Sequence, residues 1–588
     1  MRAMYRPEAP LIIQSDGSVL LEIHAAEAEL ARDALARFAE LVKSPEHVHT
    51  YRITSLSLWN AAGAGLGEAD ILGALARFAK YDLPGNVTSE IREAISRFGR
   101  LVLTKDTTSG DLRLRAADDS AARQIAASRR LTGMIGARDG LTFVVPAQAR
   151  GALKQALVHS GWPVRDDAGF AEGLALDVAF RSPTLSGRPF QVRPYQEEAA
   201  RSFLAGGHGV IVLPCGAGKT VVAMVVMTNL QTRTLILCTS TSAVHQWRRE
   251  LIDKTTLTDA DIGEYTAASK NIRPVTITTY SMLVRKASGG FPHMGVVDRG
   301  DWGLIVYDEV HLLPAPLLRM TADLQARRRL GLTATLVRED GKEGDVFSLI
   351  GPKRYDVPWR EMEAAGWVAR ASCIEVRLPM ATELRVAAAV AERSAVAYRL
   401  AAENPAKLLA LRHLVGLHAK DRILVVGQFR NQVQRAAALL GAPLVTGETS
   451  DLERERLYSA FRAGVHPVLV ASKVANFSID LPDANVLIQL SGAYGSRQEE
   501  AQRLGRILRP KERPATFYTL VSRESDEQRF AFNRQLFLAE QGYHYSIEDW
   551  EPTAGCESET LALPAGDALS EADEPDELPA LPEPGLPN

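Results

Sequence analysis

The sequence has few cysteines and no long apolar run. It contains four cysteines in 588 residues, and no two of them form a Cys-x-x-Cys pair. A disulfide framework is therefore not expected, and a reducing compartment such as the cytoplasm fits. No stretch approaches the ~20 apolar residues that a membrane-spanning helix requires. The first residues also lack the apolar segment and cleavage site of a secretory leader, so none is expected.

Basic residues are missing from the C-terminal tail. Residues 551–588 contain ten acidic residues, seven prolines and no Lys or Arg, which predicts a disordered acidic tail. The whole chain has a net charge of −3, so residues 1–550 carry +7. A mildly basic folded part is compatible with a partner that carries phosphates. Many enzymes with no nucleic-acid partner have a similar charge, so the support is weak.

Strand-like and helix-like segments alternate over residues 210–521. Short apolar runs rich in β-branched residues recur at 210–213, 234–238, 275–278, 304–307, 423–427, 467–471, 486–490 and 516–521. Such alternation predicts α/β domains with parallel sheets covered on both faces. The segment is too long for one sheet, so we expect two domains, 190–355 and 366–550.

The first 180 residues have a different character. Residues 10–23 read as a β-hairpin with Asp16 and Gly17 in the turn. Helix-period segments follow at 26–42, 69–78 and 89–98. A change of pattern near residue 109 predicts two small mixed α/β modules, 1–108 and 109–180.

The strongest local signal is IVLPCGAGKT, residues 211–220. An apolar run ends in a glycine-containing loop that opens a helix, and the N–H groups of such a loop can surround phosphates. Lys219 would reach the β- and γ-phosphates of ATP, and the Thr220 hydroxyl would bind Mg²⁺. The sequence departs from the general phosphate-loop pattern at Leu213, where a glycine is expected. The expected loop residues are Pro214, Cys215, Gly216, Ala217 and Gly218.

A second polar pair follows the apolar run 304–307, in LIVYDEVH. Ligands of parallel sheets sit at the carboxyl ends of the strands. Asp308 would hold Mg²⁺, and Glu309 would orient or deprotonate the attacking water. Further upstream, the Gln196 amide has enough donors and acceptors to read an adenine edge, with Arg193 beside it.

These motifs resemble a known series in the same order. The Lys219 loop, the D-E-V-H box, Thr333-Ala334-Thr335 and QRLGRILR (502–509) resemble motifs I, II, III and VI of superfamily 2 helicases. The strings GLTATLVRED (331–340), SIDLPDANVLIQLS (478–491), EAQRLGRILRPK (500–511) and FLAEQGYHY (537–545) resemble the xeroderma pigmentosum group B (XPB) family of DNA repair helicases, in a bacterial form. The resemblance covers most of residues 190–550.

This resemblance implies two tandem RecA-like domains with ATP in the cleft between them. It implies a 3′-to-5′ DNA helicase of DNA repair, a damage-recognition-like module at 109–180 and a thumb-like helix at 381–403. If residues 500–509 are helical, Gln502, Arg506 and Arg509 share one face. The two arginines would then meet the γ-phosphate in the transition state. Arg503, off that face, fits DNA phosphates better.

Residues at the expected strand ends are candidates for DNA contact or for coupling the ATP site to the DNA. Such contacts should go mainly to phosphates, because a motor must run over any sequence. Aromatic residues near these positions, such as Trp247, Tyr280 and Phe429, could stack on bases but are expected to pack in the core. The candidates are Thr239, Gln246, Arg248, Thr279, Thr333, Thr335, Arg338, Glu339, Asp340, Gln428, Arg430, Ser472 and Lys473.

The residues leave two other functions open. One is a translocase that remodels DNA without unwinding it. The other is an ATP-gated scaffold that recruits a nuclease partner through residues 1–180. Motifs alone do not separate these from a helicase. In either case the expected location is the bacterial cytoplasm, at the nucleoid.

Overall fold

The computed structural model describes residues 5–43, 47–106, 110–214, 216–285, 292–294, 296, 300–314, 317, 327–334, 343–357, 359–367, 371–391, 394–472, 484–492, 515–529, 531, 535, 538 and 544–551. The chain divides into two compact units, Met1–Val357 and Pro358–Asn588. This division falls inside the segment 350–366. No helix among the described residues is long and apolar enough to span a bilayer.

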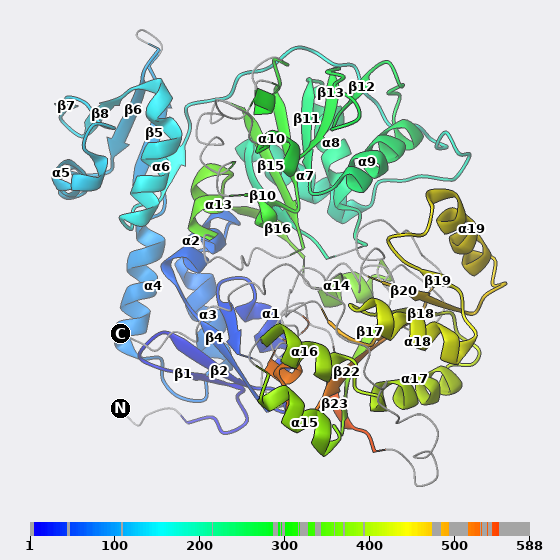
Figure 1. Ribbon diagram of the computed structural model, residues 1–588. Helices are drawn as coiled ribbons and strands as arrows, with labels where there is room; N and C mark the ends of the chain where they lie inside the picture. The colour runs from blue at the N-terminus through cyan, green and yellow to red at the C-terminus, as the bar shows by residue number, and fades with distance from the viewer. Residues whose placement is uncertain are drawn as a thin grey trace. The chain divides into compact units, whose positions relative to one another are not determined.

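The centre of the first unit is a seven-stranded parallel sheet (Figure 1). Its order is β12 (Ile262–Tyr265), β13 (Val275–Thr279), β11 (Thr234–Cys238), β14 (Leu304–Asp308), β15 (Arg328–Thr333), β10 (His208–Val212) and β16 (Lys353–Asp356). The sequence-predicted strands of this part are all present and all pair in parallel, as expected. The sheet is buried because helices such as α8 (Lys219–Leu230) and α9 (Thr241–Lys254) cover it.

The N-terminal hairpin is confirmed. Strands β1 (Leu11–Ile13) and β2 (Ser18–Glu22) pair antiparallel, and Gly17 takes the positive φ of +81° that the turn requires. With β4 (Val48–Arg52) and β3 (Glu40–Lys43) they form a four-stranded sheet. Helices α1 (Ala28–Leu35), α2 (Ser55–Gly63), α3 (Glu68–Phe78) and α4 (Gly85–Arg97) accompany it.

One expected helix of this region was wrong in part. Residues 26–42 were predicted as a single helix, but the helix ends at Leu35 and Glu40–Lys43 forms β3. Leu41 faces the core opposite Tyr51 of β4, so pairing with β4 outweighs the helical preference of this short segment.

The next module holds a five-stranded mixed sheet in the order β7 (Arg138–Asp139), β8 (Thr142–Val145), β6 (Leu112–Ala116), β5 (Leu101–Lys105) and β9 (Val164–Asp166). Helices α5 (Asp119–Ala127) and α6 (Arg150–His159) help to bury its core. Figure 1 shows α6 beside α13 (Glu343–Leu349) of the large sheet's domain. The Gln155 amide on α6 donates to the Asp345 carboxylate on α13, so the module is joined to that domain.

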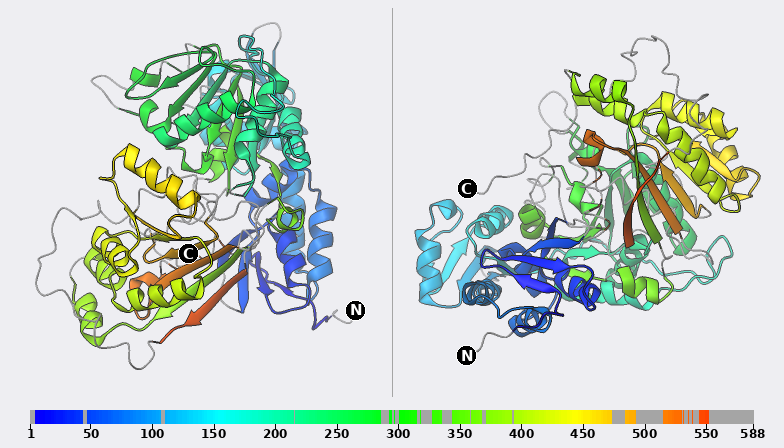
Figure 2. Two further views of the ribbon diagram at one scale, coloured as in Figure 1. Left: turned by 90° about the vertical axis from the view of Figure 1, so that its right-hand side faces the viewer. Right: turned by 90° about the horizontal axis from the view of Figure 1, so that it is seen from below.

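The second unit holds another seven-stranded parallel sheet, seen from two further directions in Figure 2. Its order is β19 (Leu444–Val445), β20 (Val468–Ala471), β18 (Ile423–Val426), β21 (Val486–Gln489), β22 (Ala515–Ser522), β17 (Ala371–Leu378) and β23 (His544–Asp549). The four sequence-predicted strands of this unit are present as β18, β20, β21 and β22. The parallel α/β architecture is therefore confirmed in both units.

The thumb-like segment differs from its prediction. Residues 381–403 were expected to form one long helix, but the structure contains α15 (Thr382–Ala389) and α16 (Ser394–Ala402). Leu384 and Ala401 are buried in one small cluster. Folding the segment back on itself buries apolar side chains that a single straight helix would leave in water.

Candidate nucleotide site and nucleic-acid interface

The glycine-containing loop runs from the end of β10 into α8. Gly216 and Gly218 have φ values of +82° and +80°, which side chains with a Cβ rarely adopt. A Cβ on Gly218 would lie 2.5 Å from the Gln196 amide nitrogen. The sequence therefore specifies a tight loop whose backbone a phosphate can approach closely, at the N-terminus of a helix.

Helix α7 (Pro194–Gly206) forms hydrogen bonds with this loop. The Tyr195 hydroxyl and the Gln196 amide nitrogen both donate to the Ala217 carbonyl, at 2.6 and 3.0 Å. The side-chain amide oxygen of Gln196 accepts from the backbone N–H of Arg193 at 3.0 Å. In this structure the Gln196 amide thus binds the loop and the helix end, and its contact with adenine stays a prediction.

The loop lysine and the acidic pair come together, as their positions at the carboxyl ends of parallel strands predict. The Lys219 ammonium lies 3.3 Å from a Glu309 carboxylate oxygen. Lys219 opens α8 after β10, and Glu309 directly follows β14; these two strands lie on the two sides of β15. Glu309 has a φ of +51°, an uncommon backbone conformation for a residue with a side chain. Such residues cluster at functional sites.

Burial and neighbouring charge shape the acidic pair. Burial, and then the Glu309 charge, raise the pKa of Asp308 to about 6, against the opposing effects of the Trp247 hydrogen bond and the Lys219 charge. A divalent cation would relieve both effects, because it favours the charged form of the carboxylates. The adjacent oxygen ligands and the nearby Thr220 therefore fit Mg²⁺, which prefers hard oxygen donors.

Two aromatic residues that the sequence predicts as core residues position this pair. The Trp247 indole N–H donates to an Asp308 carboxylate oxygen at 2.8 Å, and the Tyr280 hydroxyl donates to the Asp308 carbonyl at 2.8 Å. Both aromatic side chains are buried, as core packing predicts. Their polar ends nevertheless fix Asp308, a role that sequence spacing could not indicate.

A chain of contacts leads from the acidic pair to the next strand end. The His311 Nδ1 atom lies 2.7 Å from the Thr333 hydroxyl and 3.7 Å from the Glu309 carboxylate. Thr333 is fully buried at the end of β15. His311 is the last residue of the D-E-V-H box, and that position was the only signal for it in the sequence.

In the second unit three predicted strand-end residues surround one hollow of about 270 Å³. Gln428 and Arg430 follow β18, and Ser472 follows β20; Phe429, Thr446, Gly447 and Glu448 complete the lining. The Arg430 guanidinium pairs with the Glu448 carboxylate on this hollow. Hydroxyl, amide and guanidinium groups thus meet here, and such groups bind phosphates.

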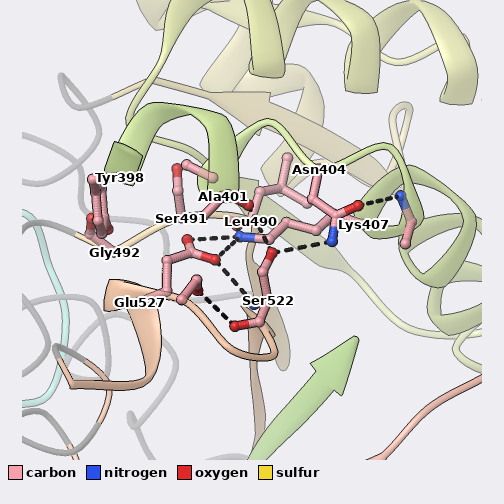
Figure 3. A network of polar contacts seen from close by, with 12 residues as sticks. Tyr398, Ala401, Asn404, Lys407, Leu490, Ser491, Gly492, Ser522 and Glu527 are labelled. Carbon is pink, nitrogen blue, oxygen red and sulfur yellow. Dashed lines mark hydrogen bonds and ion pairs between the residues drawn. The ribbon is translucent and has the colours of Figure 1, made fainter. Parts of the chain in front are cut away.

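A buried polar network surrounds Lys407 and Glu527 (Figure 3). The Lys407 ammonium donates to both Glu527 carboxylate oxygens at 2.7 Å and to the Leu490 carbonyl at 2.8 Å. The Ser491 hydroxyl accepts from the Gln428 N–H at 2.8 Å. The Tyr398 hydroxyl on α16 donates to the Gly492 carbonyl. The network thus connects the segment after β21 to α16 and to the start of the Gln428 loop.

The other predicted contact residues are less concentrated. Thr279 ends β13 and its hydroxyl accepts from the Met282 N–H at 3.1 Å, while Thr239 directly follows β11. Gln246 is exposed on α9, and the Arg248 guanidinium pairs with Asp259. Ten predicted residues lie outside the described residues: Cys215, Thr335, Arg338, Glu339, Asp340, Lys473, Gln502, Arg503, Arg506 and Arg509.

A parallel sheet, a glycine-bearing loop that opens a helix and an acidic pair two strands away define the class of phosphate-loop nucleoside triphosphatases. Family models refine this class. "ERCC3/RAD25/XPB C-terminal helicase" matches residues 362–562, "Type III restriction enzyme, res subunit" matches 189–338, and "Helicase conserved C-terminal domain" matches 11–139.

Similar proteins identify the family. The chain is 51% identical over 552 residues to "DNA 3'-5' helicase XPB" of Kineococcus radiotolerans, covering 93% of this chain and 98% of the relative. It is 49% identical to the protein of the same name from Mycobacterium tuberculosis, covering 93% and 99%. A "General transcription and DNA repair factor IIH helicase/translocase subunit XPB" of Encephalitozoon cuniculi is 33% identical, covering 92% and 82%. The chain belongs to the XPB family of helicases, as its motifs indicated.

Proposed function

We propose that this chain is an ATP-driven DNA helicase that separates strands in the 3′-to-5′ direction during DNA repair. The contact between the Lys219 ammonium and the Glu309 carboxylate carries the proposal, because it joins the phosphate-binding loop to the acidic pair. Two nearly full-length relatives, about half identical to this chain, bear the name DNA 3'-5' helicase.

ATP and Mg²⁺ are the proposed cofactors. The loop N–H groups and Lys219 would bind the phosphates, and Thr220 and Asp308 would hold the metal. Glu309 would then orient the attacking water. Gln502 would line the same pocket, and Arg506 and Arg509 would meet the γ-phosphate from the second motor domain.

DNA is the proposed substrate, bound mainly through its phosphates. In the first motor domain, 190–355, the strand-end residues and the Thr333–His311–Glu309 contacts would link DNA to hydrolysis. In the second, 366–550, the hollow beside Gln428 and Arg430 would hold the strand, together with Lys473, which follows Ser472 in the sequence, and Arg503. The Arg338-Glu339-Asp340 string would act in strand separation. The proposal locates the protein at the bacterial nucleoid.

The test measures ATP hydrolysis and strand separation on forked DNA with a 3′ single-stranded arm. The variants are wild type, Lys219→Ala and Glu309→Gln, with Arg123→Gln as a control on an exposed side chain of the same unit (71% accessible). We expect both activities in wild type and control, and neither in the two site variants.

Other outcomes would replace this function. Hydrolysis that DNA stimulates without strand separation would favour the translocase, or a scaffold that recruits a nuclease through residues 1–180. A rate of ATP hydrolysis that DNA does not change would refute the proposal of a DNA motor. Equal stimulation by RNA would remove the preference for DNA.

A further inference from the structure

A cavity of about 210 Å³ lies in the first unit, where the module with α6 and β9 meets the edge of the seven-stranded sheet. The module contributes Lys154, Arg165 and Asp166 to its wall, and the sheet's domain contributes His208 and Arg354. One water molecule needs only ~10–15 Å³. The cavity therefore has room for a group much larger than a single water.

Among the described residues, buried cations outnumber buried carboxylates beside this cavity. The Asp166 carboxylate is fully buried and accepts from Arg150 at 2.8 Å and from Lys154 at 3.1 Å, and both cations are themselves less than 10% exposed. Arg329 of β15, a third and fully buried cation, interacts electrostatically with the same carboxylate. In the described part of the chain, three buried cations thus lie around one buried carboxylate. At the rim, Arg165 and Asp167 pair with each other at 2.9 Å and add no net charge.

Burying positive charge costs free energy unless the charge is compensated. Backbone carbonyls supply part of the compensation: Arg329 donates to the Leu349 and Arg327 carbonyls at 2.8 and 2.6 Å. Burial, together with the charges of Arg329 and Arg150, lowers the pKa of Lys154 to about 7 despite its ion pair with Asp166. The surroundings therefore favour loss of a positive charge or gain of a negative one.

Two glycines leave room for the side chain of Arg354 on β16. A Cβ on Gly206 would lie 2.4 Å from the guanidinium carbon, and a Cβ on Gly209 would lie 2.5 Å from the Arg354 Cγ. Gly209 also has a φ of +143°, which favours glycine. Among the described residues the guanidinium donates only through Nε, to the His208 carbonyl at 3.0 Å. Its two terminal nitrogens remain for a ligand in the cavity that Arg354 lines.

We propose that this cavity binds a phosphate group, with Arg354 and Lys154 as its principal ligands. The two terminal nitrogens of an arginine match two oxygens of a phosphate, and a lysine adds a point charge. The bound group would add negative charge beside these buried cations and hold the module on the sheet's domain. Inorganic phosphate and a phosphate of the DNA backbone share this chemistry. The site is separate from the ATP loop and does not depend on the proposed function.

The first experiment measures the unfolding temperature of the full chain in inorganic phosphate against chloride at equal pH and ionic strength. Because phosphate can also bind the ATP loop, the measurement is repeated in Lys219→Ala. We expect a saturable rise of a few degrees in wild type, Lys219→Ala and the exposed-side-chain control Arg123→Gln. Arg354→Gln should lose the rise. A rise that Lys219→Ala abolishes and Arg354→Gln keeps would overturn the proposal.

The second experiment identifies the source of the phosphate and keeps the test valid if Arg354→Gln folds poorly. Fluorescence anisotropy follows labelled duplex DNA over a salt series for wild type, Arg354→Gln and the control Arg123→Gln, whose side chain is 71% exposed and lies outside the cavity. If DNA supplies the group, Arg354→Gln binds several-fold more weakly and with a shallower salt dependence, and phosphate competes with DNA in wild type. If free phosphate is the ligand, DNA affinity is unchanged and the thermal shift remains. No phosphate shift and no competition in wild type would refute the site.

Discussion

Replacing Glu527 by glutamine should destabilise the second unit strongly. The Lys407 and Glu527 side chains are 1% and 3% exposed, and the carboxylate also accepts from the Ser522 N–H at 3.0 Å. Glu527→Gln removes the counter-charge that the described residues provide for the buried Lys407 ammonium, with the Leu490 carbonyl among its remaining acceptors. Removing one partner of a buried ion pair costs about 3–5 kcal/mol.

Hydrogen exchange measured by mass spectrometry reports this cost locally. Since ~1.4 kcal/mol is a factor of ten, amides of β21 and β22 that exchange through opening of this unit should exchange roughly 10²–10⁴ times faster in Glu527→Gln. Peptides from β13 in the first unit provide the internal control and should not change. The double variant Lys407→Met, Glu527→Leu removes both charges and should recover most of the loss.

Two results would refute this reasoning. A change of less than tenfold in Glu527→Gln would mean that the pair is better solvated than its burial indicates. A double variant as unstable as Glu527→Gln would mean that packing, and not charge, dominates at this position.

Three further predictions follow from the same kind of contact. Trp247→Phe keeps the buried ring but removes the donor to Asp308, so a Mg²⁺ titration of ATP hydrolysis should show a requirement raised about 10–100-fold; an unchanged requirement contradicts the role. Burial, with the Arg32 charge, lowers the pKa of His49 from 6.5 to about 4. The folded state thus resists protonation, and stability should fall as pH drops from about 6.5 towards 4, by order of 1 kcal/mol per unit; His49→Phe should flatten urea midpoints over that range. Tyr398→Phe removes the bond to the Gly492 carbonyl and should cost about 1 kcal/mol by urea unfolding, with no loss in the control Tyr81→Phe.

The strands were predictable where their own residues form an apolar, β-branched run. Thr234–Cys238 has the bounds expected from its apolar, β-branched run. β15 and β23 were missed, because RRLGLT and HYSIED mix charged or small residues with few apolar ones. Their place in a sheet depends on partners distant in sequence, which periodicity within one segment does not reveal.

The site was predictable where its polar residues come shortly after the end of a strand. Lys219 and Glu309 were expected at one edge of the sheet and meet at 3.3 Å. Trp247 lies 61 positions from Asp308, on a helix whose apolar face explains a tryptophan equally well as core. No local signal distinguishes those two uses of an indole, so only the structure could assign the hydrogen bond.

The position of β17 in the second sheet has a consequence for biosynthesis. This strand is the first of its unit, yet it lies between β22 and β23, the last two. It pairs with residues as late as Asp549, so the sheet cannot be completed until nearly the whole unit has left the ribosome. A chain interrupted before His544 would leave a long strand edge of β17 open to pairing with other molecules. Premature termination in this region should therefore yield aggregates, even where every motor motif has already been translated.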